Sequence, residues 1–294
     1  MNRPTKLAFL ISSGALLMAA PAFADDTTTT TGGDAGGGSG GSEGRGAPGS
    51  GTGGGAGWTF AWPKEVVYRP YALPAKMIAV QGVLGIVKTT EVDPMTMMST
   101  STTAEVLAIG AGYGISDKIT VGGSYGLSLH AFEAKGPLTF YGEYQLVHNN
   151  HLSVAASANF TVDFATDNTA RINAGLGARY HVIPKLGIYT GAPFGPGPVG
   201  QHLAIGFNNK APVSFDVPLG LIYQATPELG IFAGTTIAHF NISNDKTAFF
   251  GADFIPLHAG GLFAITEKLD AFAVLGMGDL KNGFDISLGV QFYP

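Results

Sequence analysis

Cysteine is absent from the 294 residues of this chain. A disulfide framework and a lipid-modified cysteine are therefore both excluded. Charge is also scarce, because Asp, Glu, Lys and Arg make up 13% of the chain, against roughly a quarter in ordinary soluble domains. The formal net charge of -5 leaves no basic surface of the kind that binds nucleic acid, so we expect no nucleic-acid partner.

Long apolar runs are missing beyond the N-terminus. Residues 1–24 begin with Arg3 and Lys6, continue with a mostly apolar run and end in small residues before Asp25, which predicts a signal peptide. No later stretch approaches the roughly 18 uninterrupted apolar residues of a spanning helix. An exported chain without a helical anchor is either a secreted soluble protein or a closed membrane barrel.

Two unusual segments follow the predicted signal peptide. Residues 25–57 are rich in Gly, Thr and Ser and have no large apolar residue, so we expect a disordered linker. Residues 58–76 are rich in aromatic residues and proline, which disfavours regular strand or helix. This second segment is predicted to lie in a barrel mouth as a plug or against the periplasmic end as a cap, and the sequence leaves both open.

Residues 77–294 alternate between apolar and polar side chains. In residues 152–164, for example, Leu152, Val154 and Phe160 fall on one face and Ser157 and Asn159 on the other. The polar faces hold mostly Gly, Ser, Thr and Asn, whereas a soluble sandwich usually carries a charged exterior. The apolar faces have the length of a bilayer-spanning strand, roughly 9–11 residues. This pattern predicts an all-β, transmembrane, antiparallel up-and-down barrel.

The turns then set the number of strands. Tight turns alternate with longer loops, such as residues 91–103, 192–211 and 241–247, as in outer-membrane barrels with short periplasmic turns. About 12 strands are expected, and 10 or 14 remain open because residues 201–207 also read as extended. The expected strands span residues 77–90, 103–115, 118–130, 137–147, 151–164, 170–182, 185–191, 212–224, 228–240, 250–265, 268–277 and 283–293.

An aromatic residue stands just before each of five tight turns. Amphipathic rings prefer the boundary between hydrocarbon and water, so rings at one height in successive hairpins predict a girdle around a membrane barrel. The expected girdle residues are Tyr113, Tyr144, Tyr180, Tyr223 and Phe263.

The inward faces carry few charges of mixed sign, which argues against a strongly ion-selective ring. Inward glycines at 110, 112, 114, 122, 126, 175 and 177 either leave room for a solute or relieve crowding between strands. The lumen-facing candidates are Glu143, Asp163, Arg171, Arg179, His181, Asp216 and Asp285.

The last strand resembles the C-terminal signal strand of Gram-negative outer-membrane proteins, which the barrel-assembly machinery reads. Ser287, Gly289 and Phe292 match that pattern in order, while Pro294 occupies the final, usually aromatic place. The resemblance covers some eleven residues and names no particular family. It implies a bacterial outer-membrane location, with the assembly machinery and outer-membrane lipids as partners.

Three other sequence patterns are weaker evidence for a binding or catalytic site. Gly195, Gly197 and Gly200 fit a dinucleotide-binding spacing, but no helix follows to present its amides to phosphate. His148 and His151 lack a third metal ligand nearby, and Ser128 with His130 lacks a nucleophile motif. We therefore expect no catalytic residue, cofactor or metal.

The sequence favours a passive diffusion channel for small polar or amphipathic solutes. A structural or surface-display barrel with a closed lumen, which binds a partner through its loops or N-terminal arm, is the alternative. A membrane-embedded lipid hydrolase and a soluble secreted β protein are weaker hypotheses.

Overall fold

A computed structural model describes residues 63–92, 99–129, 136–164, 169–193, 203–206, 213–242, 246–249, 256–279 and 283–294. The predicted signal peptide, the predicted linker and residues 58–62 lie outside these ranges. The first described element is a short 3-10 helix, η1 (Val66–Tyr68). Among the described residues, no helix is long and apolar enough to cross a membrane.

All other regular elements are strands. They are β1 (Ile78–Val92), β2 (Ser99–Ser116), β3 (Ile119–Ser128), β4 (Pro137–His148), β5 (Leu152–Asp163), β6 (Thr169–Ile183), β7 (Leu186–Thr190), β8 (Leu203–Gly206), β9 (Ser214–Gln224), β10 (Leu229–Asn241), β11 (Lys246–Phe249), β12 (Leu257–Thr266), β13 (Leu269–Asp279) and β14 (Gly283–Phe292).

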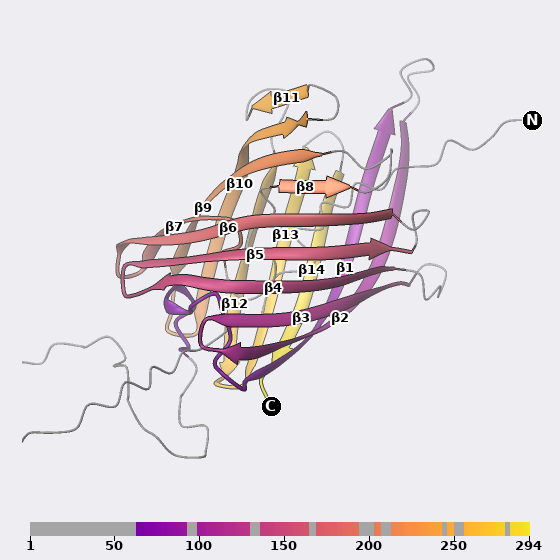
Figure 1. Ribbon diagram of the computed structural model, residues 1–294. Helices are drawn as coiled ribbons and strands as arrows, with labels where there is room; N and C mark the ends of the chain where they lie inside the picture. Colours follow the sequence, from indigo (N-terminus) through magenta and orange to yellow (C-terminus); the bar gives the residue numbers. More distant parts are fainter. Residues whose placement is uncertain are drawn as a thin grey trace, which may run out of the picture.

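The strands form one antiparallel sheet that closes on itself (Figure 1). β1 pairs with both β2 and β14, and β9 pairs with β10, so the wall is continuous around the barrel. β7 and β8 both lie between β6 and β9 and share one position in the wall. β11 and β12 likewise share one side of β10. The 14 strands of the sheet thus give a closed barrel of 12 strand positions, which confirms the predicted fold class.

All three expected loops are partly strand, and the loop expected at 241–247 contains the last residue of β10 and the first two of β11. β1 and β2 continue to Val92 and from Ser99, with Glu91 opposite Thr100, so most of the loop expected at 91–103 extends the hairpin. Within the expected loop 192–211, residues 203–206 form β8. Pro218 of β9 stands opposite the interruption between β7 and β8, and proline suits such a place because it has no N–H to give to a neighbouring strand.

The short turns, at residues 117–118, 149–151, 184–185, 226–228 and 267–268, lie at one end of the barrel, together with Ile78 and Phe292 (Figure 1). We call this the short-turn end. Most of the connections at the opposite end are longer, although β13 and β14 are joined there by residues 280–282 alone. The up-and-down order of the strands places successive connections at alternate ends of the barrel.

The two faces of the wall are inverted relative to a soluble protein. On β5, Phe160 is 39% exposed on the outside, while its neighbours Asn159 and Thr161 are each 4% exposed on the inside. The outward face along the strands is mostly Ile, Leu, Val, Phe and Tyr. Every candidate lumen residue lies on the inward face of its strand.

Candidate functional site: the barrel mouth

Residues 63–77, which we call the mouth segment, lie inside the barrel at the short-turn end (Figure 1, indigo). The side chains of Val66, Arg69, Tyr71 and Leu73 are at most 2% exposed. Its prolines prevent a regular strand, so its amides need acceptors other than a sheet ladder. Burial of the whole segment therefore depends on side chains that the barrel supplies.

Barrel side chains accept hydrogen bonds from the backbone amides of the mouth segment. Gln145 Oε1 accepts from Tyr71 at 2.8 Å and from Ala72 at 3.1 Å. Three further amides donate in the same way: Val67 to Gln224 Oε1 at 3.1 Å, Leu73 to Thr120 Oγ1 at 2.5 Å and Ala75 to Asp117 Oδ1 at 2.9 Å.

The acceptor Gln145 is itself fixed in place. Its Nε2 donates to the carbonyl oxygens of Val147 and Val154, at 2.6 and 3.0 Å, and to Ser153 Oγ at 3.1 Å. A buried amide with both ends bonded has little freedom to turn away. The mouth segment thus docks on a preorganised surface.

One buried ion pair ties the segment to the wall. Arg69 donates from Nη1 to Asp270 Oδ2 at 2.5 Å and from Nη2 to Oδ1 at 3.1 Å, a bidentate arrangement. Tyr293 adds a hydroxyl hydrogen bond to Asp270 Oδ2 at 2.8 Å. Arg69 and Asp270 are 2% and 0% exposed, so removing either partner would leave the other charge buried without compensation.

A second arginine clamps the segment from the opposite wall. Arg179 of β6 donates to the carbonyl oxygens of Arg69 and, at 3.0 Å, of Pro193, and its guanidinium lies 5.2 Å from the ring centre of Tyr71. The Tyr71 hydroxyl donates to the carbonyl oxygen of Ala192 at 3.2 Å. Burial raises the pKa of Tyr71 to about 12, so the phenol keeps its proton at neutral pH.

The chain reaches Ala192 and Pro193 by turning inward after β7. Gly191 has a φ of 84°, which glycine adopts without steric cost. This turn ends β7, and β8 later takes up the same position in the wall between β6 and β9. The turn also brings the carbonyl groups of Ala192 and Pro193 into the lumen. The start of the expected loop 192–211 and the mouth segment therefore meet inside the barrel.

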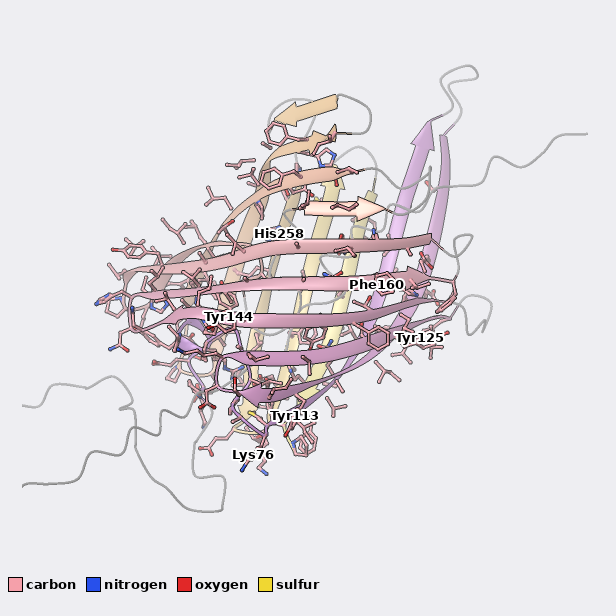
Figure 2. The ribbon with its side chains drawn as sticks, viewed as in Figure 1. Lys76, Tyr113, Tyr125, Tyr144, Phe160 and His258 are labelled. Carbon is pink, nitrogen blue, oxygen red and sulfur yellow. The ribbon has the colours of Figure 1, made fainter. Side chains whose placement is uncertain are left out.

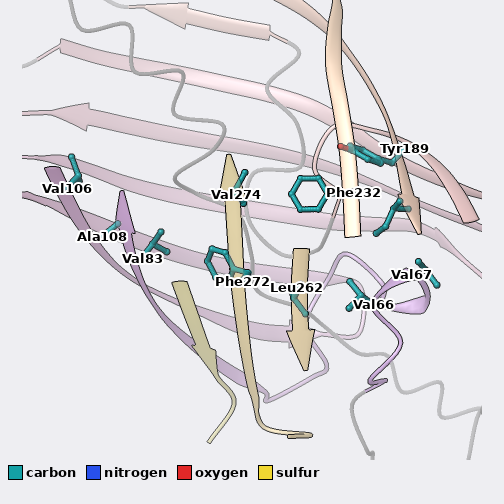
Figure 3. Close-up of a cluster of buried hydrophobic side chains, with 11 residues drawn as sticks. Val66, Val67, Val83, Val106, Ala108, Tyr189, Phe232, Leu262, Phe272 and Val274 are labelled. Carbon is teal, nitrogen blue, oxygen red and sulfur yellow. The ribbon is translucent and has the colours of Figure 1, made fainter. Parts of the chain in front are cut away.

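The interior also holds an apolar cluster in which Val66 and Val67 pack near Leu262 and Phe232 (Figure 3). Neighbouring strands contribute residues that stand opposite each other to this cluster: Leu262 pairs with Phe272, and Val83 pairs with Ala108. Val66 and Val67 gain hydrophobic stabilisation there, while the backbone amide of Val67 donates to Gln224.

The predicted lumen residues lie at two levels. Glu143, Arg179 and His181 are buried toward the short-turn end, where Arg179 and His181 contact the mouth segment, the latter through the Tyr68 ring. The other four, which lie nearer the long-loop end and are only partly buried, are Asp163, Arg171, Asp216 and Asp285. At that end, His239 Nδ1 and Asp216 Oδ1 lie within hydrogen-bonding distance, 2.6 Å apart, and both side chains are about one-third exposed. The seven residues therefore do not form one site.

The expected girdle residues lie on the outer surface. Tyr113, Tyr144, Tyr180, Tyr223 and Phe263 are 42–55% exposed. Figure 2 marks Tyr113 and Tyr144 near the short-turn end and Phe160 farther along the wall. At the C-terminus, Ser287 is buried and Phe292 is 48% exposed on the outside. Gly289, between them, has the ring of Phe272 across it. Their roles as girdle and assembly signal remain predictions.

Several inward glycines are covered by the protein's own atoms. Tyr141 lies over Gly112 and Gly122, and the backbone of Pro74 lies over Gly114. The space that these glycines create is therefore used by Tyr141 and the mouth segment rather than left for a solute.

Sequence reasoning missed the residues that hold the mouth segment. Thr120, Gln145, Gln224 and Asp270 each lie within a few residues of a short turn, and each is an inward polar group on its strand. That position was the available signal. Asp270 was hidden because both faces of β13 are largely apolar, so alternation there does not mark the inward side.

The structure gives no support to the three weaker site patterns. Residues 195–200 and His130 lie outside the described residues, and His148 and His151 lie in or beside an exposed turn. Within the described part of the chain, no cluster of three or more His, Cys, Asp or Glu side chains is arranged to hold a metal ion. An apolar groove over β9, β10 and β12, floored by Gly220 and Gly234, opens mainly among outward residues.

No protein-family model and no curated protein matches the sequence. Solved structures do match. The COG4313 outer membrane channel from Pseudomonas putida F1 shares 13% identity, with 76% of this chain and 97% of that chain covered at a TM-score of 0.52. The KdgM porin shares 7% (72% and 98% covered, TM-score 0.47), and the NanC porin 9% (72% and 98%, TM-score 0.48). At 13% identity the likeness to the COG4313 channel is one of fold alone, that of an outer-membrane β-barrel.

Proposed function

We propose that this chain is a passive diffusion channel of a bacterial outer membrane, whose mouth segment narrows the periplasmic end. The observation that carries the proposal is the closed barrel with an apolar exterior and a polar interior. Such a wall satisfies its backbone internally and faces hydrocarbon on the outside. The short-turn end is assigned to the periplasm, as in outer-membrane barrels.

The solutes would be small and polar or mildly amphipathic. Barrels of eight strands are filled by their own side chains, whereas sixteen leave an aqueous channel, so twelve positions give a narrow path. Partly exposed inward groups such as Asp216 and His239 lie toward the extracellular end, and fully buried groups lie at the mouth. Passage therefore requires the mouth segment to move or to loosen.

The matched structure from Pseudomonas putida F1 agrees with this proposal, since its name describes an outer membrane channel. A lipid hydrolase would need a nucleophile and a base that reach the lipid. In the described part of the chain, His148 Nδ1 lies 3.4 Å from Ser153 Oγ, but Ser153 is 1% exposed and faces the interior of the barrel. We therefore favour a channel over a lipid hydrolase.

The test is conductance in planar lipid bilayers, with protein purified from the outer membrane of a Gram-negative host. Arg69→Ala removes the ion pair and should weaken docking of the segment by about 3–5 kcal/mol, because Asp270 stays buried and unpaired. We expect discrete current steps that are far more frequent than in the wild type. Lys64→Ala, an exposed change in the same segment, should behave like the wild type.

Folding of each variant is checked independently by the heat-dependent gel shift of a folded barrel. If folded, inserted Arg69→Ala protein is silent, and a variant lacking residues 25–76 is silent too, the channel proposal fails. That result would favour the closed structural or surface-display barrel, which uses its loops to bind a partner.

A further inference from the structure

Asp270 lies at the base of the mouth as a fully buried carboxylate whose hydrogen-bond partners come from outside its own strand. Arg69 and Tyr293 together satisfy its two oxygens. Burial, and then the Asp270 carboxylate, raise the pKa of Tyr293 well above its ordinary value, so its hydroxyl remains a donor at neutral pH. Of these two partners, only the guanidinium belongs to the mouth segment, which lies outside the strands of the sheet.

The neighbour of Asp270 on the wall has unused hydrogen-bonding groups. Gln291 of β14 stands opposite Asp270 in register and is fully buried. Within the described residues, neither its Oε1 nor its Nε2 has a hydrogen-bond partner. Gln81 of β1 is next in the same register row, and its Oε1 also lacks a partner there. Buried amides of this kind are costly unless something bonds to them.

The charge of the wall favours a positive ligand. Among inward side chains that the structure describes on the strands, acids outnumber arginines: Glu143, Asp163, Asp216, Asp270 and Asp285 against Arg171 and Arg179. Arg69 of the mouth segment offsets part of this excess. Departure of the segment would leave an unpaired carboxylate on the wall of the lumen, where an opposite charge is attracted.

We propose that Asp270, Tyr293 and Gln291 form a subsite for a guanidinium or alkylammonium group, and that Arg69 occupies it as an internal ligand. This inference rests on the proposed function and deepens it. The solutes that pass most readily would then carry a cationic group beside an apolar portion. The cation replaces Arg69 at Asp270, and the apolar portion contacts the wall that Val66 and Val67 otherwise cover. A planar guanidinium fits best because it can bond to both carboxylate oxygens, as Arg69 does.

The first test uses Arg69→Ala, which vacates the subsite, and methylguanidinium as the probe. Channels of this variant should show a concentration-dependent reduction of current by methylguanidinium. N-methylurea, which has nearly the same shape without the charge, should have no effect. In Arg69→Ala/Asp270→Asn the apparent affinity for methylguanidinium should fall roughly tenfold or more, because a bond to a charged partner is lost. Asp285→Asn, a change of another inward acid, is the matched control and should leave the affinity nearly unchanged.

A second readout does not depend on conduction. The chain has no cysteine, so Ala155→Cys gives a single thiol at a fully buried position that packs with Tyr71. In Arg69→Ala/Ala155→Cys protein, methylguanidinium should slow labelling by a water-soluble thiol reagent, since it restores the charge balance that lets the segment dock. Asp270→Asn should remove this protection.

The outcomes separate the two proposals. Conducting channels whose methylguanidinium affinity is the same with and without the Asp270→Asn change would overturn the subsite and leave the channel standing. Silent protein that still shows Asp270-dependent protection would overturn the channel and leave the subsite standing. Equal effects of methylguanidinium and N-methylurea in both assays would reduce the Arg69 and Asp270 contact to a structural ion pair.

Discussion

At the scale of single residues, large inward side chains lie across glycines of neighbouring strands. The Tyr189 ring covers Gly220, and its hydroxyl is bonded to His258 Nε2 at 2.7 Å. By contrast, an added Cβ at Gly142 would meet nothing within 4 Å. An inward glycine such as Gly220 therefore has no room for a larger side chain, whereas the outward Gly142 has room for one.

We expect Gly220→Ala to lower the free energy of unfolding by about 1–3 kcal/mol, because the new methyl group displaces the Tyr189 ring. Gly142→Ala should be neutral or stabilising by up to about 1 kcal/mol, since alanine loses less conformational entropy in a strand. Urea titration of the refolded barrel measures both. Tyr189→Leu should recover part of the loss in Gly220→Ala, and strict additivity of the two changes would contradict the packing explanation.

At the scale of elements, the mouth segment is held by single side chains from separate strands. Gln145 alone accepts the amides of Tyr71 and Ala72. We expect Gln145→Ala to expose the segment, because two buried donors lose their acceptor at about 1–3 kcal/mol each. Labelling of Ala155→Cys should then accelerate at least roughly fivefold. Gln81→Ala, a change of an inward glutamine on β1, is the control, and equal acceleration by both would refute the docking role of Gln145.

The last strand is the second element with a predicted role. Phe292 is outward at the end of β14 and stands between Val80 and Leu269 in register. If the resemblance to the assembly signal holds, Phe292→Ala should reduce the amount of folded protein in the outer membrane several-fold. Phe284→Ala removes the same ring from the other end of β14 and should have little effect. Equal yields in a heat-shift gel of membrane fractions would argue against the signal.

At the scale of the whole molecule, the inward charges predict modest ion selectivity. Acids exceed arginines on the described inward wall, but the excess is spread along the lumen and Asp163 lies near Arg171. We expect the open Arg69→Ala channel to prefer potassium over chloride, with a preference that weakens as salt rises because charges are screened. The reversal potential under a KCl gradient measures this preference. A preference for chloride would show that groups other than these acids set the field.

The sequence alone determined the architecture of the barrel. Alternation such as Asn159, Phe160 and Thr161 assigns each side chain to a face, because strand geometry has a period of two. The tight turns defined the hairpins, and the count of about twelve strands was confirmed. The interruption at Pro218 and β8 was visible only as the doubtful strand at 201–207.

Only the tertiary structure decided what fills the mouth. Arg69 and Asp270 are 201 positions apart in the chain, and no local pattern relates them. Closure of the wall brings Gln145, Gln224 and Asp270 around one segment, and this meeting depends on the register of every strand between them. Local side-chain direction is a property of the sequence, whereas contact between distant residues is a property of the closed ring.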